Sequence, residues 1–412
     1  MKESFNIVIV GHVDHGKSTL IGRLLYDTRS LPKEKIVEVR KISKELGKEM
    51  ELAFLMDHLK EEREKNITID TTQIFFKSRK RNYVIIDAPG HVEFTKNMLT
   101  GASRADGSLL IIDAHAGIQE QTRRHAYLLK MLGIKDLIVV LNKMDLVRYK
   151  EHVFNTLKEE ILTFLKTLNL YPSFIIPLSS KEGIHISKYS SLMPWYQGHY
   201  LINALDQLKM NEKTKKPLRL PIQDIYECDG TKIIVGKITS GTLKQGQKVT
   251  LLPTREQVQV ASIMAFGKSK KKNAQKNENI GLIITPSLPI KRGDVLSDSH
   301  QSAKIKNIFG AHLFWISEKP LKINEPFTLR CNTQSVHCEV LKIEKRINSS
   351  TLQVLEIDAS LLNTNEAAVV VLEAKVPLIH DPFNFIEEMG RFVIEQDFNI
   401  QGAGVIKEDT LF

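Results

Sequence analysis

The sequence predicts an α/β domain, in which helices cover both faces of a mostly parallel sheet, followed by two β-barrel domains. Three observations predict this fold class. The chain has 412 residues, which at roughly 150 residues per domain suggests two or three domains. Up to about residue 206, strand-length apolar runs alternate with helical patterns, as in parallel sheets. After about residue 217, short β-type runs follow one another without helices, as in barrels or sandwiches.

The first domain is predicted over residues 1–210. Two segments carry apolar residues at helical spacing and are the expected crossover helices, QEQTRRHAYLLKMLG and EHVFNTLKEEILTFLKTLN. The segment TTQIFFKSRK is expected to add an edge strand. Residues 33–65, rich in Lys and Glu, are expected to be helical, either as part of a nucleotide switch or as a solvated helix. Buried strands are expected at 5–10, 82–87, 107–113, 136–142 and 173–178.

A linker is expected after this domain, because MNEKTKKPLRLP is charged, contains two prolines and has no periodicity. The β-type runs that follow it cover roughly 200 residues, which is too much for one small barrel. The polar stretch 297–306 divides them. We therefore expect one barrel over 217–300 and a second over 304–412.

The composition excludes several classes of protein. A net charge of +10, with 42% hydrophobic and 26% charged residues, is ordinary for a globular chain and excludes disorder as the main state. The three cysteines lack the spacing of a disulfide framework or a zinc site, which favours a reducing compartment. No run approaches the roughly 20 apolar residues of a membrane helix, so we expect a cytoplasmic protein without a membrane partner. Net charge alone does not choose between a nucleic acid, an acidic protein and a nucleotide.

The first functional motif, GHVDHGKS over residues 11–18, directly follows the first predicted strand and precedes a helical pattern. It fits the phosphate-loop template of Gly, four residues and Gly-Lys-Ser/Thr in the context that this template requires. Backbone N–H groups surround the phosphates, the lysine contacts the β- and γ-phosphates, and the serine hydroxyl reaches Mg²⁺. A chance glycine-rich turn is the alternative. The expected nucleotide-binding residues are Asp14, His15, Gly16, Lys17, Ser18 and Thr19.

The second motif, DAPGH, stands at the carboxyl end of the predicted strand NYVIID, where open α/β sheets bind ligands. Asp87 is expected to hold Mg²⁺, and the Gly90 N–H to contact the γ-phosphate. His91 would then lie beside that phosphate, where a polar side chain can orient the attacking water. A surface histidine after a glycine turn is the alternative. We therefore expect His91 to be the catalytic residue.

The third motif, NKMD, follows another predicted strand and decides which base is bound. The Asp145 carboxylate accepts hydrogen bonds, and guanine offers it two donors, whereas adenine offers an acceptor at N1. A mismatch of this kind is costly, so GTP is expected over ATP. Turn residues after a strand are the alternative. The expected base-binding residues of this motif are Asn142, Lys143 and Asp145.

Two weaker signals complete the predicted site. SSK, which comprises Ser179, Ser180 and Lys181, follows the strand SFIIPL and is expected to close over the guanine. Thr68 in NITID is expected to bind Mg²⁺ from a loop that orders around the γ-phosphate. A threonine in an ordinary strand is the alternative reading of Thr68.

These motifs together resemble the translational GTPase superfamily, in the branch shared by elongation factor 1-alpha or Tu and the GTPase subunit of bacterial sulfate adenylyltransferase. The resemblance covers nearly the whole chain, through GHVDHGKST, MDHLKEEREKNITIDTT, DAPGHVEFTKNMLTGASRADG, NKMD and MPWYQG. It implies a GTP-binding domain with two β-barrels, GTP or GDP with Mg²⁺, a magnesium threonine at Thr68 and a water-positioning histidine at His91. Asn66 departs from the glycine common in that switch motif.

The last domain favours one branch. AHLFWISEKPLKINEPFTLRCN and GRFVIEQDFNIQGAGVI resemble the sulfate adenylyltransferase subunit, and the histidine-rich stretch of elongation factors is missing. The resemblance implies a regulatory subunit that couples GTP hydrolysis to formation of adenylyl sulfate and pyrophosphate from ATP and sulfate. A partner subunit, in a heterodimer or larger complex, would carry the chemistry on ATP.

The alternative is an elongation factor that delivers aminoacyl-tRNA. Its main support is GKSKKKNAQK over 267–276, where lysines crowd one loop of the first barrel. Such loops are more often solvated surface, and no aromatic residues interleave to stack bases. Nucleic acid is therefore not the expected partner.

Overall fold

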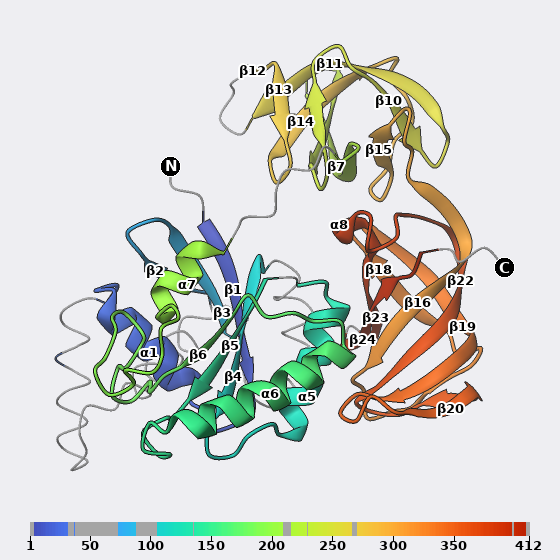
Figure 1. The fold of residues 1–412 in the computed structure, drawn as a ribbon. Helices are drawn as coiled ribbons and strands as arrows, with labels where there is room; N and C mark the ends of the chain where they lie inside the picture. Colours follow the sequence, from blue (N-terminus) through green and yellow to red (C-terminus); the bar gives the residue numbers. More distant parts are fainter. Residues whose placement is uncertain are drawn as a thin grey trace. The chain divides into compact units, whose positions relative to one another are not determined.

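The computed structural model describes residues 4–31, 37, 73–87, 105–134, 136–208, 216–228, 230–265, 270–397 and 399–408. It divides into two compact units, Met1–Glu212 and Lys213–Phe412 (Figure 1). The helix predicted over 33–65 lies outside the described residues except at Val37, and so does much of the predicted linker.

The first unit contains a six-stranded sheet with the order β2-β3-β1-β4-β5-β6. The strands are β1 (Ser4–Gly11), β2 (Gln73–Lys77), β3 (Asn82–Asp87), β4 (Gly107–Asp113), β5 (Asp136–Asn142) and β6 (Phe174–Pro177). β2 runs antiparallel to β3, whereas the other neighbours run parallel. Every residue of β4 is buried, as expected for a strand covered on both faces. The predicted buried strands and the added edge strand are confirmed.

Helices cover both faces of this sheet (Figure 1). They are α1 (Lys17–Asp27), α5 (Glu120–Met131), α6 (Glu151–Thr167) and α7 (Leu201–Gln207). Ile7 and Ile9 of β1 share one core cluster with residues of α1 and α7. Val8 and Val10 alternate with them and therefore point to the opposite face, and α5 contacts β1 and β4. No helix among the described residues is long and apolar enough to cross a membrane.

The spacing of apolar residues explains why α6 forms. Its buried residues recur every three or four positions and make one apolar stripe, Phe154, Leu157, Ile161, Phe164 and Leu165. Glu151 in the first turn and Lys166 in the last turn complement the helix dipole. The predicted crossover helix is therefore present with its apolar face turned inward.

The second unit contains two seven-stranded sheets. The first comprises β7 (Arg219–Cys228), β8 (Thr231–Lys237), β10 (Lys248–Leu252), β11 (Glu256–Ala265), β12 (Lys270–Lys271), β14 (Asn279–Thr285) and β15 (Val295–Asp298), beside a small pair of β9 (Thr242–Lys244) and β13 (Asn273–Gln275). β10 pairs with both β15 and β11, so the order β10-β15-β7-β8-β14-β11 closes on itself. The sheet is therefore a barrel, to which β12 is added at β11.

The other sheet closes in the same way. It comprises β16 (Lys304–Trp315), β18 (Phe327–Cys331), β19 (Gln334–Asn348), β20 (Val354–Ala359), β22 (Glu366–His380), β23 (Arg391–Gln396) and β24 (Asn399–Ile406), beside the pair β17 (Leu321–Lys322) and β21 (Leu361–Leu362) and the short helix α8 (Glu387–Gly390). β18 pairs with both β23 and β19. Two β-barrels after the α/β domain are thus confirmed. The boundaries proposed for the domains, 1–210, 217–300 and 304–412, stay predictions.

A buried ion pair joins the two barrels within the second unit. The Arg219 side chain at the start of β7 is fully buried, and that of Asp381, just after β22, is 3% exposed. Arg219 donates to both Asp381 carboxylate oxygens, at 2.7 and 3.0 Å, and also to the Leu218 and Gln301 carbonyl oxygens. The two bonds to Asp381 are buried, and a buried charge without its partner is costly.

Removing the carboxylate is therefore expected to destabilise the second unit strongly. Asp381→Ala leaves the Arg219 charge buried and unpaired, which costs about 3–5 kcal/mol. Urea unfolding of the full chain would measure the loss, followed by Trp315 fluorescence in a Trp195→Phe background. As a control, Glu356→Ala removes the exposed partner of Arg346 and is expected to cost less than about 1 kcal/mol. Equal midpoints for the two variants would contradict the importance of the buried pair.

Candidate nucleotide-binding site

The phosphate loop connects β1 to α1. Gly11 ends β1, and α1 begins at Lys17. Gly16, directly before the helix, has φ of 90°, and a Cβ there would lie 2.4 Å from the amide nitrogen of Asn142. Both the left-handed backbone and the close approach require glycine. The motif thus lies between a strand and a helix, as the phosphate-loop template requires.

The N-terminus of α1 is open to an anion. The N-cap residue, Gly16, has no side chain to cap the helix, and the first turn, which includes Ser18 and Thr19, contains no acidic residue. Unpaired backbone N–H groups and the helix dipole favour negative charge at such an end. Lys17 Nζ donates to the carbonyl oxygens of Gly11 at 2.7 Å and His12 at 2.8 Å, so its charge lies over the loop. A phosphate group fits this arrangement.

Two predicted residues of the loop have different surroundings. Asp14 is exposed with φ of 63°, so it shapes the turn by its left-handed backbone. His15 is only 2% exposed, and its Nδ1 lies 3.3 Å from the Ile111 carbonyl oxygen of β4. Burial lowers the pKa of His15, so its imidazole is neutral at pH 7. The His15 side chain therefore packs beneath the loop, which leaves its backbone as the group available to phosphate.

A second histidine lies buried on α5. His125 is 5% exposed, and burial, together with the nearby Lys17 charge, lowers its pKa to about 3. It is therefore neutral over the physiological range. Neither His15 nor His125 adds positive charge beside Lys17.

Asn142 connects the phosphate loop to the SSK segment. Its side chain is almost fully buried at the end of β5. The Asn142 amide donates to the His15 carbonyl oxygen at 2.8 Å and accepts from the Ser180 backbone N–H at 2.9 Å. Three segments far apart in the sequence thus meet at one side chain. Asn142 braces the site, a role that its position in NKMD alone did not indicate.

Lys143 is held by a residue that sequence reasoning missed. Its backbone is left-handed, with φ of 61°, and its Nζ lies 2.8 Å from Asp113 Oδ2 at the end of β4. Asp113 also accepts the His115 N–H at 2.8 Å. Burial opposes ionisation of Asp113, but the bonds from Lys143 and His115 outweigh it and lower its pKa. The only available signal was positional, since Asp113 follows a predicted strand, where parallel sheets gather functional groups.

Two polar atoms near Asn142 have no hydrogen-bond partner within the described part of the chain. One belongs to Asp145, three residues after Asn142, and the other to Ser180, whose N–H donates to Asn142. Asp145 Oδ1 and Ser180 Oγ are both buried without a hydrogen bond. Buried polar groups in folded proteins are nearly always satisfied, so each is open to a ligand. A carboxylate of this kind suits a base edge with two donors, as guanine has. Ser179 is buried and its Oγ accepts the Glu182 N–H at 3.2 Å, whereas Lys181 is exposed.

The γ-phosphate end of the predicted site is not described. Thr68, Gly90 and His91 lie outside the described residues, and of Asp87 only the place at the end of β3 is described. Their assigned roles stay predictions.

The lysine loop of the first barrel is partly described. Lys271 pairs with Glu278 at 2.6 Å, and Lys276 pairs with Glu388 at 2.5 Å. These two lysines are therefore partly neutralised within the chain.

A phosphate loop opening onto a helix N-terminus, next to an unsatisfied carboxylate at the edge of the same parallel sheet, defines a phosphate-loop nucleotide-binding protein. Residues 2–211 match the family described as the elongation factor Tu GTP binding domain. Residues 232–297 match elongation factor Tu domain 2, and 308–407 match the GTP-eEF1A C-terminal domain-like family. The chain belongs to the elongation factor Tu family of GTPases, and its nucleotides are GTP and GDP, accompanied by Mg²⁺.

Its relatives share nearly its whole length. Elongation factor 1-alpha of Archaeoglobus fulgidus is 38% identical and aligns over 99% of this chain and 98% of the relative. Elongation factor 1-alpha of Pyrococcus horikoshii is also 38% identical, over 98% of this chain and 97% of the relative. A crystal structure of sup35 complexed with GMPPNP is 25% identical, covers 99% of this chain and 94% of that chain, and has a TM-score of 0.46.

The predicted sulfate adenylyltransferase function is wrong. The relatives that contradict it are proteins named Elongation factor 1-alpha. The predicted partner, an ATP-using sulfate adenylyltransferase subunit, is therefore also wrong. The expectation that nucleic acid is not a partner is wrong for the same reason. The physical reason lies in the residues on which the branch was chosen. In AHLFWISEKP, the residues Leu313, Phe314 and Trp315 are buried in or around the last barrel. Such residues report how a barrel packs and say little about what it binds.

Proposed function

We propose that this chain is a GTP-dependent translation elongation factor that delivers aminoacyl-tRNA. The observation that carries the proposal is the identity of 38% with proteins named Elongation factor 1-alpha over 98–99% of the chain. The nucleotide-binding domain and the two barrels fit a carrier in which GTP and GDP forms differ in affinity for a cargo.

In the proposed site, the backbone of residues 14–19 surrounds the phosphates and Lys17 contacts the β- and γ-phosphates. The Asp145 carboxylate accepts two hydrogen bonds from guanine, since one of its oxygens is buried without a partner among the described residues. The remaining residues proposed to enclose the nucleotide are Gly90, Asn142, Lys143, Ser179, Ser180 and Lys181.

Mg²⁺, when bound, neutralises charge on the phosphates during transfer. Its proposed ligands are Ser18, Thr68 and Asp87, because hydroxyl and carboxylate oxygens are the groups that this ion prefers. Ser18 lies in the first turn of α1, beside the open helix end.

The proposed delivery function has a direct test. The full chain, loaded with a non-hydrolysable GTP analogue, is expected to protect the ester bond of aminoacyl-tRNA from hydrolysis. The same chain loaded with GDP is expected to protect the ester bond at least roughly tenfold less well. A tenfold difference corresponds to a coupling free energy of about 1.4 kcal/mol between nucleotide and cargo. Uncharged tRNA as a competitor controls for binding through charge alone. Equal protection with both nucleotides, or none with either, would overturn the proposal.

His91→Ala is expected to slow GTP hydrolysis about 100-fold while leaving the affinity for GTP nearly unchanged. The reason is that His91 is proposed to orient the water that attacks the γ-phosphorus as the bond to the β-phosphate oxygen breaks. Single-turnover hydrolysis and equilibrium nucleotide binding measure the two effects separately. His152→Ala, at an exposed position on α6, is the matched control. An unchanged hydrolysis rate in His91→Ala would refute the assignment.

A further inference from the structure

The loop that carries Asp145 ends in an unusual backbone. Arg148 and Tyr149 are consecutive, neither is glycine, and both are left-handed, with φ of 54° and 57°. The loop closes on itself through the Arg148 N–H, which donates to the Asp145 carbonyl oxygen at 3.1 Å, and the Tyr149 N–H, which donates to the Met144 carbonyl oxygen at 2.8 Å. Residues held in this region of φ persist when surrounding contacts determine them.

One such contact comes from a side chain far along the sequence. The Trp195 indole Nε1 donates to the Tyr149 carbonyl oxygen at 3.0 Å, across 46 residues. Trp195 belongs to the MPWYQG motif, which lies between β6 and α7 and to which the sequence assigned no role. The bond connects that motif directly to the end of the loop over residues 143–149, which carries Asp145 and is called the guanine loop below.

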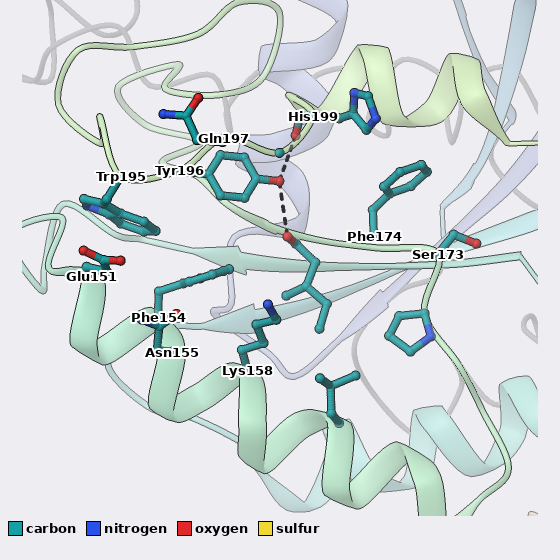
Figure 2. A pocket seen from close by; sticks show the side chains of 14 residues that line it. Glu151, Phe154, Asn155, Lys158, Ser173, Phe174, Trp195, Tyr196, Gln197 and His199 are labelled. Atoms are coloured by element: carbon teal, nitrogen blue, oxygen red, sulfur yellow. Dashed lines mark hydrogen bonds between the residues drawn. The ribbon is translucent and has the colours of Figure 1, made fainter.

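The Trp195 ring is itself held in place. It lies against Phe154 of α6, with ring centroids 5.3 Å apart, and Phe154 is 5% exposed (Figure 2). The neighbouring Tyr196 ring meets Phe154 edge-on at 5.9 Å, and its hydroxyl donates to the His199 carbonyl oxygen at 3.0 Å. The direction of the indole N–H is therefore determined by contacts outside the nucleotide site.

The Trp195 ring also borders a groove of the first unit. Trp195 and Tyr196 line a groove of about 510 Å³, together with Phe154, Phe174 and Lys158 (Figure 2). Trp195 is half-buried there, whereas Trp315 in the last barrel is 1% exposed. These are the two tryptophans of the chain, so the fluorescence of Trp195 can be isolated.

We propose that Trp195 is a positioning residue of the guanine site, acting through the Tyr149 carbonyl oxygen to hold the loop in which Asp145 meets the base. The inference rests on the proposed role of Asp145. Loss of the indole N–H frees the end of the loop, so the bound nucleotide is released faster while the phosphate contacts of Lys17 are unchanged.

The test compares two aromatic variants of the full chain. Trp195→Phe keeps a ring against Phe154 but removes the N–H, and is expected to raise the GDP dissociation rate about fivefold to tenfold, the effect of one partly buried hydrogen bond. Tyr196→Phe is the matched control, because the bonds that it loses go to Ile175 and His199 and not to the guanine loop. It is expected to change the rate less than twofold. A wild-type rate in Trp195→Phe, or equal acceleration in both variants, would overturn the proposal.

Two further measurements separate positioning from general loosening. In a Trp315→Phe background, GDP binding is expected to change the fluorescence of Trp195, and an unchanged spectrum would contradict the contact with the loop. In the double variant Trp195→Phe with Asp145→Asn, the two effects are expected to be less than additive, because both act on the same hydrogen bonds to guanine. Full additivity would contradict the proposed route. If Asp145→Asn alone leaves the affinity for GDP unchanged, the proposed role of Asp145 in binding guanine is wrong. That result differs from a wild-type GDP dissociation rate in Trp195→Phe, which would contradict only the proposed role of Trp195.

Discussion

Asp145→Asn is expected to lower the affinity for GDP about 1000-fold. The carboxylate is proposed to accept two hydrogen bonds from guanine, and bonds to charged groups contribute roughly 1.5–3 kcal/mol each. Asn keeps the size of the side chain but replaces one acceptor oxygen by an NH₂ donor, which then faces the donors of guanine. Xanthine carries an oxygen where guanine carries the amino group. The variant is therefore expected to bind xanthosine diphosphate better than GDP.

Competition binding with GDP, inosine diphosphate and xanthosine diphosphate measures this change of base preference. Asp224→Asn is the matched control, since Asp224 is an exposed aspartate of β7 in the second unit. It is expected to leave all three affinities unchanged. Retained preference for GDP in Asp145→Asn would show that another group selects the base.

Asn142→Ala is expected to weaken GDP and GTP binding by a factor of roughly 100 or more. The substitution removes both the donor to the His15 carbonyl oxygen and the acceptor for the Ser180 N–H. Each buried group left without its partner costs about 1–3 kcal/mol, and nucleotide binding depends on both loops that these groups hold. The loss is expected to be similar for GDP and GTP, because neither bond touches the γ-phosphate end of the site.

Isothermal titration with both nucleotides checks this expectation. Asn155→Ala, an exposed Asn on α6 of the same unit, is the control and is expected to bind as the wild type does. A further variant, Asn142→Asp, keeps an acceptor for Ser180 but places a buried carboxylate against the His15 carbonyl oxygen, and is expected to bind both nucleotides at least as weakly as Asn142→Ala. A loss confined to GTP would contradict a bracing role.

Sequence reasoning predicted the parts of the molecule that local chemistry determines. Strands such as β4 follow from uninterrupted apolar runs, and α6 follows from its helical spacing. The phosphate loop was recognisable from its template of Gly, four residues and Gly-Lys-Ser/Thr between a predicted strand and a predicted helix. The structure then shows why glycine is required at position 16. Asp145 was recognisable because its carboxylate suits one base and not another.

The parts that were missed depend on contacts between distant residues. Asp113 meets Lys143 only because β4 and β5 are neighbours in the sheet, and Trp195 meets Tyr149 only through the packing of Phe154. No spacing in the sequence encodes either contact. The choice of branch failed for a related reason, since it relied on barrel residues such as Trp315, whose identity is set by the core that they fill.

The buried histidines beside the phosphate loop have a consequence for behaviour in acid. In an unfolded chain such a histidine takes up a proton near pH 6.5, whereas His125 in its folded setting does so only near pH 3, and the pKa of His15 is also lowered. As the pH falls below about 6.5, these two histidines bind protons more readily in the unfolded chain than in the native state. The free energy of unfolding therefore decreases as the pH falls from about 6.5 toward the lower pKa of the folded histidine. A mildly acidic medium therefore weakens this domain while the His125 imidazole in its core is still neutral.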